Sequence, residues 1–91
     1  MMHTRTWTVE ITIDEHEEER RTHAVAVLRT EARPQVRGEG TAHRAPRDRE
    51  VPAIGDELAT ARALADLAYQ LLDVTAADIE AVVHRPVFLD S

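Results

Sequence analysis

The sequence predicts an α+β domain, a three-stranded antiparallel β-meander followed by a long and a short helix packed on one face, in the order β-β-β-α-α. Three segments in the first half of the chain alternate apolar and polar residues with the two-residue period of a strand. The second half carries apolar residues at helical spacing. All 91 residues, 1–91, are expected to form a single domain. The strands are expected at about 6–14, 22–30 and 36–44, and the helices at about 56–73 and 76–84.

The first two strands are expected to form a hairpin. One face of the first strand is apolar and consists of Trp7, Val9, Ile11 and Ile13. The run DEHEEERR, residues 14–21, contains no apolar residue and predicts an exposed turn. In the second strand, the alternate residues Ala24, Ala26 and Leu28 are expected to face the same core as Trp7 and Ile11.

Val25 and Val27 lie on the opposite face of the second strand. A sheet face that is open to water normally presents polar residues, so these two apolar side chains indicate that a partner covers them. Scattered exposed valines are also common in monomers, and that alternative stays open.

The third strand is expected to follow a turn around Pro34. One of its faces carries small apolar residues, namely Val36, Gly38, Gly40 and Ala42. Because glycine inside a strand gives up side-chain packing, Gly38 and Gly40 predict that a neighbouring backbone or helix approaches this face closely.

The long helix is expected to begin with Asp56 as its N-cap and Glu57 in its first turn. A helix start can receive a phosphate, but these two carboxylates would repel one, so the sequence favours a structural cap at this position. The run TAAD, residues 75–78, is similar to a capping box with Asp in the place of Glu. It predicts the start of the short helix, which Pro86 ends.

Several chemistries are excluded by residue type. The chain contains no Cys and no Lys, and its one Ser is Ser91. Disulfides, thiolate nucleophiles, cysteine-ligated metals, Schiff bases and a phosphate-loop lysine are therefore impossible, and a serine triad is disfavoured. Glu39, between two glycines, is expected to be a strand surface residue. No catalytic residue, cofactor or metal ion is predicted, and the chain is expected not to be an enzyme.

The acidic run that surrounds His16, with His23 beyond it, is a candidate metal site. The residue types suit a hard cation or zinc. Adjacent acids on an exposed turn do not converge on one point, however, so a solvated turn is favoured.

The charge distribution keeps a nucleic-acid role open. The net charge is −6, yet residues 29–49 carry six Arg against three acids. Five of these Arg residues and one His are expected along the third strand and the loop that follows it. We call them the Arg strip; it consists of Arg33, Arg37, His43, Arg44, Arg47 and Arg49. The strip has no interleaved aromatic residues, and the acidic pI of about 5.3 opposes nucleic-acid affinity.

Nothing in the sequence indicates a membrane protein. No apolar run approaches 18 residues, and the N-terminus lacks the pattern of a signal peptide. A cytoplasmic location is expected.

Three stretches carry a family resemblance: WTVEITIDEH, GEGTAHRAPRDREVPAIGDELATARALADLA and DIE. In this order they resemble a small actinobacterial family of unknown function. The resemblance implies a fold similar to that of double-stranded-RNA-binding domains. It implies no activity, and so no catalytic residue.

The expected function is a non-enzymatic interaction module that self-associates through its sheet, as a homodimer or a higher homo-oligomer. The interface would be either an exposed strand edge or the sheet face that carries Thr8, Glu10, Val25 and Val27. The alternative is a nucleic-acid-binding accessory protein that uses the Arg strip.

Overall fold

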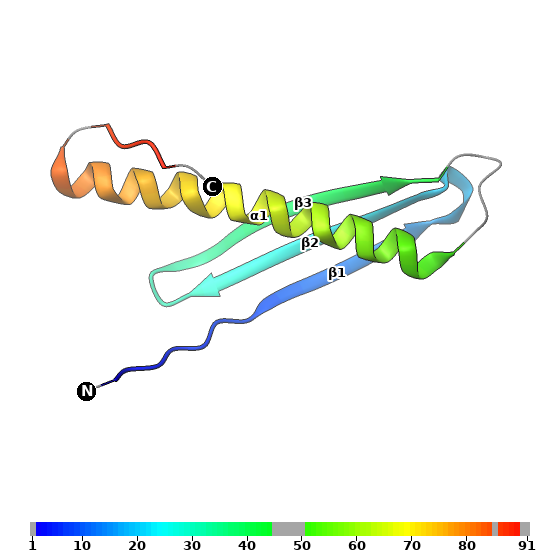
Figure 1. Ribbon diagram of the computed structural model, residues 1–91, viewed down its shortest axis with the longest axis horizontal. Helices are drawn as coiled ribbons and strands as arrows, with labels where there is room; N and C mark the ends of the chain where they lie inside the picture. The colour runs from blue at the N-terminus through cyan, green and yellow to red at the C-terminus, as the bar shows by residue number, and fades with distance from the viewer. Residues whose placement is uncertain (1, 45–50, 85, 90–91) are drawn as a thin grey trace.

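Three antiparallel strands and then one long helix make up the fold in a computed structural model, which describes residues 2–44, 51–84 and 86–89 (Figure 1). The strands lie in the order β1-β2-β3. The predicted α+β class and antiparallel meander are confirmed. The elements are β1 (Val9–His16), a 3₁₀ turn η1 (Glu17–Glu19), β2 (Arg21–Thr30), β3 (Arg33–His43) and α1 (Pro52–Val83).

The β1–β2 hairpin is shifted towards its turn, because β1 is Val9–His16 rather than about 6–14. Its register runs without interruption from Val9 opposite Leu28 to His16 opposite Arg21, so the first part of the charged run belongs to β1. The turn itself is η1 with Arg20, whose φ of 51° is left-handed. The prediction that all of residues 14–21 form the turn is wrong, because strand pairing continues through exposed residues that need no apolar side chain.

The β2–β3 hairpin turns earlier than predicted. Glu31 and Ala32 form the turn, and Pro34 lies inside β3. The prediction of a turn at Pro34 is therefore wrong. Proline occurs on edge strands and at bulges, and Pro34 lies on an edge strand opposite the register irregularity between Leu28 and Thr30.

Helix α1 is a single helix of 32 residues, so the prediction of a long and a short helix is wrong. It begins at Pro52, a residue suited to the first helical position, with Val51 rather than Asp56 as N-cap. At the predicted break the helix continues, and the hydroxyl of Thr75 donates a hydrogen bond to the carbonyl oxygen of Leu71 at 2.8 Å instead of capping a new helix. Leu71 and Val74 are partly buried against the core, so apolar packing continues along α1 up to Thr75.

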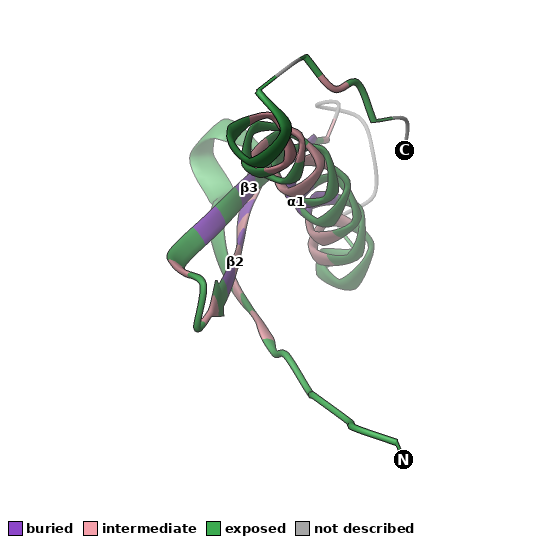
Figure 2. Ribbon diagram, turned by 90° about the vertical axis from the view of Figure 1, so that its left-hand side faces the viewer, coloured by how far each residue is buried: buried purple, intermediate pink, exposed green. Residues whose placement is uncertain are grey.

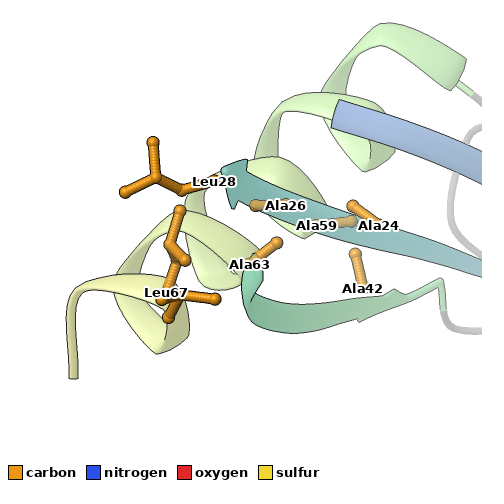
Figure 3. Close-up of a cluster of buried hydrophobic side chains, with 8 residues drawn as sticks. Ala24, Ala26, Leu28, Ala42, Ala59, Ala63 and Leu67 are labelled. Atoms are coloured by element: carbon orange, nitrogen blue, oxygen red, sulfur yellow. The ribbon is translucent and has the colours of Figure 1, made fainter. Parts of the chain in front are cut away.

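The core lies between α1 and the face of β2 and β3 that it covers (Figure 3). Five of its eight buried residues are alanine; the set is Ala24, Ala26, Leu28, Val36, Ala42, Ala59, Ala63 and Leu67. A Cβ atom at Gly38 would lie 2.2 Å from the backbone nitrogen of Leu67, and one at Gly40 would lie 2.3 Å from that of Ala63. The predicted close approach at the two glycines is confirmed.

Helix α1 lies on one side of the sheet and packs mainly on β2 and β3 (Figure 2). A helix is about 10 Å wide and strands are about 4.8 Å apart, so one helix covers about two strands. The C-terminal end of α1 extends past the end of the sheet, and residues 86–89 run beside α1 (Figure 1). Within the described ranges, no helix combines the length and the hydropathy needed to cross a membrane.

Candidate functional site

The open face of the sheet, opposite α1, contains the two valines that the sequence singled out. Val25 lies between Thr12 and Glu39 on the neighbouring strands, and Val27 lies between Glu10 and Arg37. Both valines are half-buried. Thr8 lies immediately before β1 and is exposed. The apolar part of this face is therefore a narrow stripe flanked by polar side chains.

A polar network borders the valine stripe. The ring of His23 lies 3.1 Å from Thr41 Oγ1 through Nδ1 and 3.1 Å from Glu39 Oε1 through Nε2. Arg37 donates to the same Glu39 oxygen at 3.2 Å. Glu39 is thus a surface residue, as predicted, and its Oε1 contacts the side chains of both His23 and Arg37. This contact of His23 was not predicted from the sequence, because it depends on the pairing of His23 with Thr41 on the neighbouring strand.

The acidic turn holds an ion pair. Arg21 donates from Nε to Glu19 Oε2 at 2.9 Å, and this hydrogen bond together with the charge of Arg21 lowers the pKa of Glu19. Among the described residues, no group of His, Asp and Glu is arranged to hold a metal ion.

The inner face, on the α1 side, also carries apolar residues that are not buried. Because α1 covers two strands, the apolar residues of β1 lie at its margin: Val9 and Ile11 are half-buried, and Ile13 is 41% exposed. Trp7 is 59% exposed, so its predicted place in the core is wrong. Leu64 of α1 is 42% exposed. Sequence periodicity identifies the face of a residue, but the width of the covering helix decides whether that face is buried.

The β3 edge of the sheet is covered by side chains of α1. The backbone N–H of Glu39 donates to Asp66 Oδ2 at 2.9 Å. Arg62 donates from Nη1 to the carbonyl oxygen of Thr41 at 2.7 Å. Within the described part of the chain, β1 has no comparable bond from a side chain to its outer edge. The two edges of the sheet therefore differ.

The Arg strip does not form one patch among the described residues. Arg33 pairs with Asp78 of α1, and Arg37 pairs with Glu39. Arg33 and Arg44 lie at opposite ends of β3, which is roughly 36 Å long at about 3.3 Å per residue. His43 is exposed at the Arg44 end. Arg47 and Arg49 lie outside the described residues.

A hollow of about 180 Å³ lies where α1 begins. Its lining combines Arg20, Arg21 and Arg44 with Glu15 and Glu17. Helix α1 has no acidic residue in its first turn, because it begins one turn before Asp56. Asp56 and Glu57 lie in the second turn, so they do not cap the helix start as predicted.

The chain is similar to proteins of mycobacteria. A family model described as Rv2632c-like matches residues 5–88. The uncharacterized protein Mb1767 of Mycobacterium bovis is 54% identical over 80 residues, which is 88% of this chain and 82% of that protein. The uncharacterized protein Rv2632c of Mycobacterium tuberculosis is 49% identical over 83 residues, which is 91% of this chain and 86% of that protein.

The crystal structure of Rv2632c is similar to this chain, with a TM-score of 0.80 and 47% sequence identity. The similarity covers 93% of this chain and 98% of that chain.

Proposed function

The chain belongs to the Rv2632c-like family, and from the geometry of its sheet we propose that it is a small non-enzymatic interaction module that assembles with a second copy of itself. The observation that carries this proposal is the incomplete cover of the sheet. Helix α1 packs on β2 and β3 and leaves the apolar inner face of β1 at its margin.

The energetics favour assembly. A chain of this size buries a modest share of its surface, and five of its eight core residues are alanine, which contribute little apolar area each. Larger apolar side chains stay outside, including Trp7 at 59% and Ile13 at 41% exposure. Burying apolar surface stabilises by about 25 cal/mol per Å², so covering these residues in a dimer would add to the small free energy of unfolding expected for a chain of this size.

The non-enzymatic part of the proposal is supported by the environment of the polar groups. Catalytic acids and bases are usually held in clefts, where burial and charged neighbours perturb their pKa values. Here the network of His23, Arg37 and Glu39 lies on an exposed strand face. Glu19, whose pKa is lowered, lies on an exposed turn and is paired with Arg21.

The test is the mass in solution. The chain weighs 10.2 kDa, and light scattering after gel filtration should give about twice this value over a range of micromolar concentrations. A mass of 10.2 kDa at every concentration would contradict self-association. Val27→Asp then distinguishes the possible interfaces. A fall of the mass to that of one copy would indicate a contact on the open face, whereas an unchanged mass would indicate a contact on the inner face or at a strand edge.

A nucleic-acid-binding role is a second candidate, favoured by one observation. Arg20 and Arg44 line the hollow at the start of α1, where the first helical turn carries no acid. The net charge of −6 opposes this role. A double-stranded-RNA-binding type of fold stays a prediction. Duplex RNA should shift in a gel at low salt, and the shift should be lost when Arg44 and Arg47 become Ala; no shift at low salt would end this candidate.

A further inference from the structure

We infer that the second copy pairs along β1: the two β1 strands join antiparallel about a two-fold axis, with Ile11 opposite Ile11 of the second copy, and form one continuous sheet. This inference rests on the proposed self-association and specifies its surface. Four features of the chain lead to it, namely the direction of the backbone groups, the contrast between the edges, the segment before β1 and the charges along the strand.

The backbone directions follow from the β3 edge. In an antiparallel pair, opposite residues alternate between those that exchange backbone bonds and those whose N–H and C=O point away from the partner strand. The N–H of Glu39 and the C=O of Thr41 bond side chains of α1, so they point away from β2. Val25 and His23 lie opposite them, and their own backbone groups therefore point towards β1.

The same alternation carries across to β1. The β1–β2 register is unbroken, with Thr12 opposite Val25 and Ile11 opposite Ala26. Thr12 consequently exchanges bonds with β2, whereas Ile11, like Val9 and Ile13, directs its N–H and C=O outward. The residues with outward backbone groups are thus the ones whose apolar side chains α1 covers incompletely.

The two edges of the sheet differ in how far they are protected from pairing with another strand. The β3 edge carries Pro34 and is bonded by Arg62 and Asp66, which are devices that prevent another strand from adding to it. Among the described residues, the β1 edge has neither device. An edge of this kind accepts a further strand through main-chain bonds, and apolar side chains on one face add affinity.

The segment before β1 favours a second copy as the added strand. Residues 2–8 are exposed and extend away from β1, and the pairing with β2 begins only at Val9 (Figure 1). Pairing centred on Ile11 places residues 6–8 of each copy opposite residues 14–16 of the other. Each copy thereby extends the other's sheet, and Trp7 lies beside Glu15 of the second copy, next to its Ile13. Arg5 then approaches the acidic turn around Glu17.

Charge selects the register. Residues whose N–H and C=O point outward must lie opposite one another in the two β1 strands. The nearest alternative registers therefore place Glu10 or Thr12, instead of Ile11, on the two-fold axis. A centre at Ile11 places Glu10 opposite Thr12 and Asp14 opposite Thr8 of the second copy. A centre at Glu10 places Glu10 opposite itself, and a centre at Thr12 places Glu10 opposite Asp14. Like charges directly opposite each other are destabilising, so both shifted registers are disfavoured.

The first test compares three masses. Ile11→Pro removes an outward N–H that the single copy does not use, and it should reduce the mass from about twice 10.2 kDa to 10.2 kDa. Val27→Asp is the matched control on the other face and should keep the doubled mass. A doubled mass for Ile11→Pro overturns the edge pairing but leaves self-association standing. A wild-type mass of 10.2 kDa overturns both.

The second test does not depend on tolerance of proline. Because the chain has no Cys, single cysteine variants cross-link only where they meet their own copy. Opposite residues of a bonded pair lie about 5.5 Å apart between Cα atoms, within the range of a disulfide, so Ile11→Cys should link to itself under mild oxidation. Two copies of Ile13→Cys would be roughly 13 Å apart and should not link.

A mixture of two cysteine variants tests the register of the pairing. Val9→Cys and Ile13→Cys should each stay unlinked alone and should link when combined, because residue 9 faces residue 13 in this register. Linking of Ile13→Cys alone at the rate of Ile11→Cys, or no linking of Ile11→Cys in a protein of doubled mass, overturns the inference.

Discussion

Asp66 of α1 accepts a hydrogen bond from the backbone N–H of Glu39 at 2.9 Å, so the helix that covers one face of the sheet also closes one of its edges. Arg62, one turn earlier, donates to the carbonyl oxygen of Thr41 at 2.7 Å. Two adjacent turns of α1 thus satisfy one donor and one acceptor of β3, which ties the helix to the sheet by polar contacts at its rim.

Replacing Asp66 should weaken this tie. Asp66→Ala removes a charged acceptor from a backbone donor, and the free energy of unfolding should fall by about 1 kcal/mol, as for an exposed hydrogen bond to a charged group. Urea denaturation measures the change. Asp73→Ala, an exposed acid on the same helix, is the control and should stay within about 0.5 kcal/mol of the wild type. Equal losses in the two variants would mean that Asp66 contributes only as a helix surface charge.

The glycines of β3 should tolerate no side chain. Gly38→Ala and Gly40→Ala would each place a methyl group within 2.3 Å of the helix backbone, which cannot rotate away. We expect a loss of about 3 kcal/mol or more for each, at the upper end of overpacking costs, measured by urea denaturation.

Gly55→Ala is the matched comparison for these glycines. Its Cβ atom would meet first the Oγ1 of Thr22 at 3.0 Å, and the residue lies in a helix, where alanine is favoured over glycine by about 1 kcal/mol. This variant should stay within about 1 kcal/mol of the wild type. A loss as large as that of Gly38→Ala would show that the start of α1 is packed as tightly as its centre.

Thr75→Ala distinguishes one helix from two. If α1 is continuous, the hydroxyl of Thr75 only back-bonds to Leu71, and alanine should leave the unfolding free energy unchanged or raise it by about 0.5 kcal/mol. An N-cap of a separate helix would instead lose about 1 kcal/mol. Circular dichroism at 222 nm during urea unfolding gives both the stability and the helix content.

The pKa of Glu19 can be tested by NMR titration of its carboxyl carbon. The hydrogen bond from Arg21, and then its charge, should hold the pKa below the ordinary value of 4.5. Because the pKa is lower in the folded chain, the associated stability is present above the unfolded pKa and is lost as pH falls through the folded value. Arg21→Gln should return the pKa towards 4.5. An unchanged pKa in that variant would assign the shift to other groups.

Periodicity predicted the parts of the fold that depend on local alternation. The strand faces of Ala24, Ala26 and Leu28 are buried as expected, and Gly38 and Gly40 meet the helix. These predictions succeed because a strand places alternate side chains on opposite faces, whatever surrounds it.

The errors arose where local signals competed or where the arrangement of elements decides. Asp56 and Thr75 are both residue types that favour caps, yet Pro52 begins the helix earlier and core packing carries it through Thr75. The exposure of Trp7 and Ile13 depends on how far α1 reaches across the sheet. The contact between His23 and Glu39 depends on strand register, which no short sequence pattern encodes.

The meeting of α1 with the glycines of β3 limits how this protein can change in evolution. A larger residue at position 38 or 40 would need a smaller one across the contact, but the facing atoms belong to main chain, and nearby Ala59 and Ala63 can be reduced only to glycine. That reduction costs about 1 kcal/mol of helix propensity at each position and frees little volume. Compensating double substitutions are therefore not available, and saturation mutagenesis should find these four positions nearly invariant while the outer strand surface varies widely.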